Sequence, residues 1–211
     1  AQGMAVGHRY WFWFPIPAPE MPMPRGSLPS GQLIASAEDM AHTLIALLNG
    51  GHYGDAQILS EAGIAEMHRG VAAHVAMGVE MGKYGMGWYV SETGGTRVVW
   101  HSGTVPDFAS YMALLPEQGK GIILLANADH FMMNPALSEV GAGAASLLAG
   151  EAPPAIQLGF IPWMMRGLLL IPILQAAGVV MTIGRLRRWR SDPVSRPSGG
   201  RAWGLHLLLP L

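Results

Sequence analysis

The feature that most constrains this chain is a run without any charged residue, from Gly167 to Gly184. Its length is about the 18–20 residues that an α-helix needs to cross the hydrocarbon core of a bilayer. Trp163 and Trp189 flank it, and tryptophan is typical of the two membrane–water interfaces. Arginines follow the run at 185, 187, 188 and 190. This pattern predicts a transmembrane helix whose arginine side is cytoplasmic. A buried core helix is the alternative, and Pro172 and Gln175 favour it most.

The composition also indicates that part of the chain contacts lipid. Half of the 211 residues are hydrophobic and only 13% are charged, which is unusual for a purely soluble domain. The net charge of −1 provides no basic field for nucleic acid. The arginine cluster is therefore interpreted as a topology signal that also suits anionic lipid. Cysteine is absent, which excludes disulfides, thiolate catalysis and cysteine zinc sites.

The sequence is expected to be a fragment of a longer protein, incomplete at both ends. The chain begins at Ala1 without a basic or apolar signal segment, and it stops inside the apolar run from Trp203 to Leu211. We expect residues 1–150 to be a partial soluble domain whose N-terminal half is missing. Residues 151–190 would hold the membrane helix and its basic flank, and residues 191–211 a linker and the start of a second apolar segment. The soluble part is then expected on the extracytoplasmic side.

The pattern within residues 1–150 predicts an α+β sandwich. Residues 1–25 are aromatic and proline-rich, which favours a covering loop. Helices are expected from Ser36, where Asp39 completes a capping box, from Ser60, and over 135–148. A loop is expected over 71–82. Strands are predicted at 84–90, 97–102, 109–115 and 121–126, antiparallel because their connections are short. The last strand, apolar throughout, is expected to be buried on both faces.

One tripeptide at the end of a predicted strand could carry chemistry: His101, Ser102 and Gly103. Alone, such a histidine is more often a hydrogen-bonded structural residue. Together with the segments around it, however, the tripeptide resembles the C-terminal half of the beta-lactamase-related serine hydrolases, which include class C beta-lactamases, penicillin-binding proteins, D-aminopeptidases and esterases. The resemblance rests on Gly31 to Ala41, Ile58 to Ser60, Met67, Tyr84 to Trp88, His101 to Gly103, Leu114 to Glu117 and Leu125 to Asn127.

The resemblance implies acyl transfer through a serine ester, with a lysine one helical turn after the nucleophile. No serine in this chain has a lysine three residues later, because Lys83 and Lys120 are preceded at that spacing by Glu80 and Glu117. The nucleophile is therefore expected upstream. Tyr89 superficially matches the family's tyrosine motif but comes too late in the order, and we interpret it as structural.

The resemblance also implies a role for each residue of the cleft wall. The backbone N–H of Thr104 would join the oxyanion hole, and Gly103 would leave room for substrate. Ser102 would hydrogen-bond a substrate carbonyl or carboxylate, and His101 would donate a hydrogen bond or bind an anion when protonated. Classical members have lysine where His101 stands, and a mostly neutral ring favours the esterase and D-aminopeptidase side. Asp107 stands where the family usually has a turn glycine, and aspartate tolerates such turns.

The sequence therefore predicts a membrane-anchored serine hydrolase for an ester, a D-amino-acid peptide or a beta-lactam-like substrate, with a small acyl compound or a cell-wall peptide as its ligand. No cofactor is expected. The remaining histidines have no ligand spacing with carboxylates, which disfavours a metal site. Two other hypotheses remain open: a non-catalytic ectodomain that binds a ligand and signals or anchors through the membrane, and a soluble part that regulates membrane transport.

Overall fold

The computed structural model describes residues 3–19, 25–76, 79–130, 134–156, 159–195 and 199–200. It divides into two compact units, Ala1–Gln157 and Leu158–Leu211.

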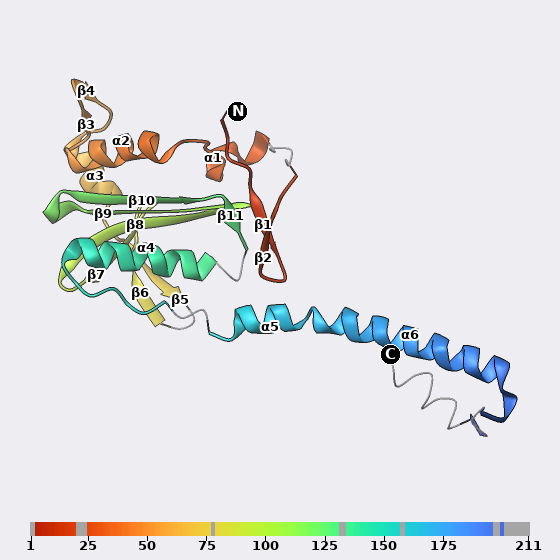
Figure 1. Cartoon of the computed structure of the whole chain (residues 1–211). Helices are drawn as coiled ribbons and strands as arrows, with labels where there is room; N and C mark the ends of the chain where they lie inside the picture. Colours follow the sequence, from red (N-terminus) through yellow and green to blue (C-terminus); the bar gives the residue numbers. More distant parts are fainter. Residues whose placement is uncertain are drawn as a thin grey trace. The chain divides into compact units, whose positions relative to one another are not determined.

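The first unit is built on a six-stranded antiparallel sheet with the order β10-β9-β8-β7-β6-β5 (Figure 1). Its strands are β5 (Ala72–Ala76), β6 (Val79–Tyr84), β7 (Tyr89–Thr93), β8 (Thr96–Val105), β9 (Phe108–Leu115) and β10 (Lys120–Ala126). Each strand pairs with the next one along the chain, so short turns suffice as connections. The antiparallel sheet predicted from the connection lengths is confirmed.

Helices cover both faces of this sheet (Figure 1). On one face, α2 (Ala37–Leu48) and α3 (Glu61–Met67) place Leu44, Leu47 and Ile64 against Val99 and Leu114. On the other face, α4 (Asn134–Ala149) packs against β9 and β10. The helix starts follow the local sequence, because the side chains of Ser36 and Ser60 accept hydrogen bonds from backbone N–H groups in the first turn.

Two predictions about the strands were wrong. The predicted loop over 71–82 is largely the β5–β6 hairpin, and the predicted strand over 84–90 contains the turn that joins β6 to β7. In that turn the Gly85 N–H donates to the Trp88 carbonyl at 2.7 Å. The small residues of this stretch have weak strand propensity by themselves. Pairing with neighbouring strands, where Gly82 lies against the Val90 carbonyl, overrides that propensity.

The expectation for the last predicted strand was correct only in part. Helices α2 and α4 contact β10 on its two faces, but β10 stands at the end of the strand order and Leu125 is 46% exposed, so the strand is not fully buried. The buried strand is its neighbour β9, where Ala113, Leu114 and Leu115 are fully covered. A continuous apolar run does not itself distinguish a central strand from an edge strand.

The N-terminal segment is not a simple covering loop, which corrects a further prediction. β1 (His8–Trp11) and β2 (Phe14–Pro17) form a hairpin, and β1 pairs in parallel with β11 (Ala128–Asp129). The prolines fit because β2 is an edge strand, where a missing N–H is tolerated. Residues 20–24 of the proline-rich run lie outside the described residues. The short elements of this unit are η1 (Arg25–Ser27), α1 (Leu28–Gly31), β3 (His52–Tyr53), β4 (Ala56–Gln57) and η2 (Pro116–Gln118).

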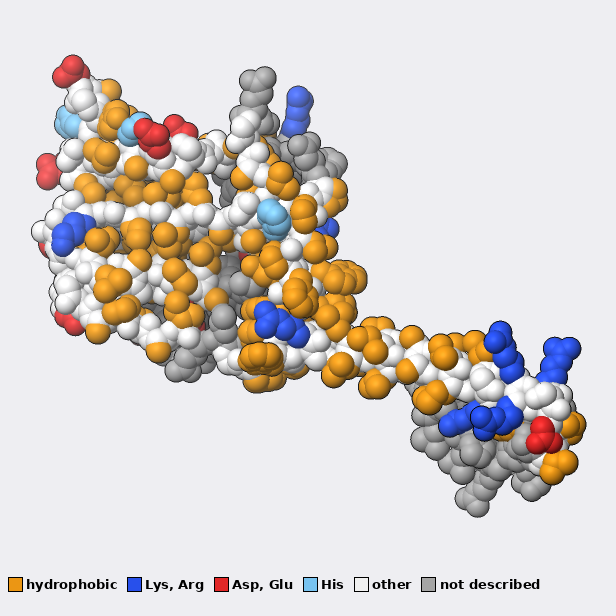
Figure 2. All heavy atoms as spheres, viewed as in Figure 1, with side chains coloured by type: hydrophobic (Ala, Val, Ile, Leu, Met, Phe, Trp, Pro, Cys, Tyr) orange, Lys and Arg blue, Asp and Glu red, His pale blue; other side chains and the backbone are white. Residues whose placement is uncertain are grey.

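The second unit contains α5 (Ile161–Gly167), α6 (Leu170–Ser191) and η3 (Pro193–Ser195). The stretch Ile161–Ser191 has a mean hydropathy of 2.0 over its most apolar window, of which only 6% is buried. At 1.5 Å per residue its helical length is about 46 Å, enough to cross a bilayer. Apolar side chains follow the helix and basic ones gather near its end (Figure 2). By length and composition it is one candidate span, and the apolar run after Trp203 lies outside the described residues.

Candidate functional site

The residues predicted to line the cleft lie together on β8. His101, Ser102, Gly103 and Thr104 are paired with Met112, Tyr111, Ser110 and Ala109 of β9. On the other side of β8, the pairing with β7 ends at Trp100, which lies opposite Tyr89. From residue 101 to 105, β9 is thus the one strand paired with β8 in the described part of the chain. A strand edge of this kind is a place where an extended ligand can add to a sheet.

His101 is half-buried at the point where β7 ends. Its Nε2 lies 3.5 Å from the Tyr84 hydroxyl, at the long limit of a hydrogen bond. Its ring is stacked on that of Tyr89, with the centroids 5.4 Å apart and the planes at 21°. The ring is therefore in contact with two tyrosines that sequence reasoning did not assign to the site.

Tyr89 is the centre of this group of rings. The centroids of His74, Trp100 and Tyr84 lie 4.3, 4.6 and 4.7 Å from that of Tyr89. Tyr84 and Trp100 are its direct partners on β6 and β8, so strand register brings the aromatic residues together. The sequence interpretation of Tyr89 as a strand residue agrees with its position in β7. Its contact with His101 depends on a register that the sequence does not show.

Gly103 lies close to the side chain of its partner on β9, Ser110. A Cβ atom at this position would come 2.5 Å from the Ser110 Oγ. A side chain at residue 103 would thus make the Ser110 hydroxyl rotate, and the clearance for substrate expected from the sequence stays a prediction. Ser102 is half-buried, whereas Thr104 is exposed near the end of the strand.

The turn after β8 is anchored to the N-terminal hairpin. Pro106 and Asp107 form the two-residue connection, and Asp107 takes a left-handed φ of 68°. This agrees with the expectation that aspartate can replace the family's glycine here. The buried Asp107 carboxylate accepts hydrogen bonds from Arg9 Nε at 3.1 Å and from the second guanidinium nitrogen at 2.9 Å. The Asp107 hydrogen bond, and secondly its charge, raise the pKa of Arg9.

Sequence reasoning missed Arg9, because the two partners are 98 residues apart and no local signal connects them. Arg9 also lies opposite Asp129 in the parallel β1–β11 pair. Burial is the main reason that the pKa of the Asp129 carboxyl is raised, and the nearby charge of Asp107 adds to it. Together these residues hold the end of the β8–β9 hairpin against β1, close to Thr104.

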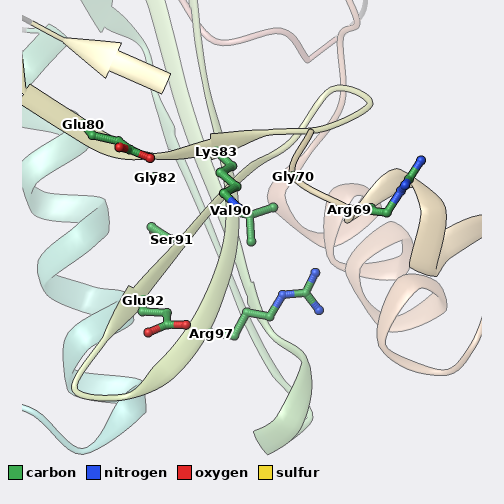
Figure 3. A pocket seen from close by; sticks show the side chains of 9 residues that line it. All are labelled: Arg69, Gly70, Glu80, Gly82, Lys83, Val90, Ser91, Glu92 and Arg97. Carbon is green, nitrogen blue, oxygen red and sulfur yellow. The ribbon is translucent and has the colours of Figure 1, made fainter. Parts of the chain in front are cut away.

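A separate hollow of about 440 Å³ lies beside β6 and β7 (Figure 3). Its charged lining residues are Arg69, Lys83, Arg97, Glu80 and Glu92. Arg97 donates to the His68 carbonyl at 2.5 Å, and Arg69 forms an ion pair with Glu66. A second hollow, of about 510 Å³, lies between α4 and residues 153–156. Neither is lined by residues 101–104, so these two hollows are distinct from the open edge of β8.

The described residues provide no ready metal centre. Among them, no three histidine, aspartate or glutamate side chains are grouped closely enough to hold an ion. The arrangement at β8 provides instead a backbone edge, a hydroxyl from Ser102 and an imidazole from His101. These groups can align a carbonyl compound by hydrogen bonds.

Comparison with known proteins agrees with this fold. The sequence profile of the family described as "Beta-lactamase" matches residues 2–146. "Protein flp" of Staphylococcus aureus, in strains NCTC 8325 and COL, is 27% identical over 101 residues, which are 48% of this chain and 18% of that protein. The octameric penicillin-binding protein homologue from Pyrococcus abyssi has a TM-score of 0.57 and 25% identity, over 72% of this chain and 32% of that one.

The chain therefore spans less than a third of each of these relatives. The family match nevertheless covers well over half of the chain, and the solved structure shares its arrangement of helices on an antiparallel sheet. The matched residues include β8 with its histidine, serine and glycine, and the hairpin to β9. On this sequence match and this shared fold, the chain belongs to the beta-lactamase family.

Proposed function

We propose that this chain forms one wall of the active cleft of a serine hydrolase. The observation that supports the proposal best is the edge of β8 from His101 to Thr104, where β7 has ended and the family's cleft-wall motif stands. An acyl substrate would lie along this edge. The nucleophilic serine and its lysine would come from a segment outside this chain, since no serine here has a lysine three residues later.

In this proposal each residue of the edge has a separate task. The Thr104 backbone N–H would stabilise the oxyanion of the tetrahedral intermediate. The Ser102 hydroxyl would hold a second polar group of the substrate, and His101 would donate a hydrogen bond near the reacting carbonyl. An imidazole, unlike the permanently cationic lysine of classical members, does not favour the carboxylate of a beta-lactam, so the expected substrate is an ester or a D-amino-acid peptide.

The candidate span at Ile161–Ser191 supports an anchor in a bacterial-type membrane, with the β-lactamase-like unit on the extracytoplasmic side. The arginines at 185, 187, 188 and 190 support this orientation by the positive-inside rule. The lipid bilayer would then be a partner, together with a small acyl substrate or a cell-wall peptide. The N-terminal half of the domain would complete the cleft.

The test is turnover of p-nitrophenyl butyrate and nitrocefin by the intact protein in detergent, beside its His101→Ala variant. We expect hydrolysis of the ester and a loss of at least about 10-fold in kcat/KM, which is about 1.4 kcal/mol of transition-state stabilisation. His52→Ala is the matched control, because His52 is an exposed histidine on the β3–β4 hairpin. Equal activity of the His101→Ala variant and the parent would remove His101 from the site.

A non-catalytic role in ligand binding is the second candidate. The hollow beside β6 and β7 favours it, because Lys83, Glu80 and Glu92 line it and no ion pair joins them in the described part of the chain. Charges of both signs suit a zwitterion such as a peptide end. This function gains support if the folded protein turns over neither substrate, resists labelling by fluorescent penicillin, and shows a higher Tm with D-alanyl-D-alanine.

A further inference from the structure

We infer that Tyr84 is a positioning residue for His101, and that its hydroxyl donates to Nε2 so that the ring proton resides on Nδ1. The role in catalysis rests on the proposed function, whereas the state of the ring does not. The contact is the 3.5 Å approach of the Tyr84 hydroxyl to Nε2. Such contacts are often long in a free enzyme and shorten when substrate binds.

The backbone of Tyr84 is held firmly enough for this task. Its carbonyl accepts from the Val71 N–H at 2.9 Å, and it is the last residue of β6, paired with Tyr89. Next to it, a Cβ atom at Gly85 would come within 2.6 Å of the Met67 carbonyl and 2.7 Å of the Arg69 carbonyl. The turn is thus packed tightly onto the end of α3, and the position from which the Tyr84 ring extends is set by that packing.

Tyr89 limits how the two rings can move. Its ring is stacked on that of His101, with the centroids 5.4 Å apart, and it is tilted against that of Tyr84, with the centroids 4.7 Å apart. The His101 and Tyr84 centroids are 6.2 Å apart. With one ring face of His101 against Tyr89, tilting the imidazole out of its present plane would break an aromatic contact. In this orientation Nε2 is the nitrogen that the Tyr84 hydroxyl meets.

The direction of this hydrogen bond sets which ring nitrogen can donate elsewhere. In a neutral imidazole one nitrogen carries the proton and the other accepts, and the hydrogen bond made by one of them sets the tautomer. A tyrosine hydroxyl that donates to Nε2 leaves Nδ1 protonated. For the proposed hydrolase this would give His101 a single defined donor toward substrate instead of a mixture of two tautomers.

The experiment is NMR of the intact protein in detergent, with ¹⁵N-labelled histidine rings, at a pH where the His101 ring is observed to be neutral. In the wild type we expect the Nε2 shift of an unprotonated nitrogen and the Nδ1 shift of a protonated one. Tyr84→Phe removes only the hydroxyl and should change the tautomer ratio of His101 at least twofold. Tyr53→Phe is the matched control, because the Tyr53 ring contacts another histidine, His42, with the ring centroids 4.8 Å apart.

The wild-type spectrum alone can overturn the inference, even if Tyr84→Phe does not fold, by showing the proton on Nε2. An unchanged tautomer ratio in folded Tyr84→Phe would overturn it as well. Where the protein hydrolyses an ester, Tyr84→Phe should lower kcat about 3- to 10-fold, and adding it to His101→Ala should cause no further loss. Absence of hydrolysis with the expected spectra would reject the proposed function and leave the positioning of His101 standing.

Discussion

His68 lies at the carboxyl end of α3, where its ring meets Trp88 edge-on at a centroid distance of 5.5 Å. A helix C-terminus ordinarily favours a protonated histidine. Here burial acts in the opposite direction and is the main reason that the pKa of His68 is lowered from 6.5, with the positive charge of Arg97 as the second reason. Within the described residues Nε2 has no hydrogen-bond partner. A proton on this ring would therefore be poorly solvated.

This environment predicts a pH-dependent stability. Below about pH 6.5 the unfolded chain binds a proton at His68 that the folded chain does not yet bind, so the free energy of unfolding rises with pH in this window. The stabilisation is complete above pH 6.5 and is lost as the pH falls toward the lowered pKa, by at most about 1.4 kcal/mol per pH unit. Urea unfolding of the intact protein in a mild detergent between pH 7.5 and 5 measures this slope.

His68→Gln should flatten that slope, whereas His52→Gln, at an exposed position, should leave it unchanged. Identical slopes in all three proteins would show that another group carries the pH dependence. His68 contacts Trp88 and its carbonyl accepts from Arg97, so the effect expected here is on stability.

At the scale of elements, α4 shows how closely a helix and a sheet can approach. Gly141 lies against the ring of Tyr111 on β9, and a Cβ atom there would overlap the ring. Two residues along the same helix, a Cβ at Gly143 would make an ordinary contact of 3.5 Å with Pro153. The Tyr111 hydroxyl is buried with the ring, which raises the pKa of Tyr111 to about 12.

The two glycines should therefore respond oppositely to alanine. Gly143→Ala should stabilise the protein by up to about 1 kcal/mol, because alanine favours the helix. Gly141→Ala should destabilise it by about 1–3 kcal/mol, because overpacking against Tyr111 outweighs that preference. Thermal unfolding of the two variants beside the parent tests this, and stabilisation by both would show that α4 can shift away from β9 at little cost.

At the scale of the whole molecule, the proposed orientation in the membrane can be tested by labelling introduced cysteines. The chain contains no cysteine of its own, so there is no background labelling. Asp55→Cys places a thiol in the first unit, and Ser191→Cys places one after the arginines. We expect an impermeant maleimide to label residue 55 in intact cells and residue 191 only after permeabilisation. The reverse pattern would invert the topology, and labelling of both in intact cells would argue against a membrane span.

The features that the sequence alone determined are those whose cause is local. Ser36 and Asp39 form the capping box because the two side chains are three residues apart on one turn. Gly94 and Gly95 end β7 with left-handed φ values of 56° and 77°. The uncharged run from Gly167 to Gly184 lies within a helix long enough to be a span. The order of family motifs likewise identified the family and assigned residues 101–103 to its cleft-wall strand, which the structure extends to Val105.

Only the tertiary structure decided what depends on partners distant in the chain. The β5–β6 hairpin forms from residues with weak strand propensity because β7 pairs beside it, and the edge position of β10 depends on strand order. The Arg9–Asp107 pair joins residues 98 positions apart. Tyr84 meets His101 because the registers of β6, β7 and β8 place them together. Periodicity specifies which face of a strand is apolar, whereas register and neighbours come from the packing of the whole unit.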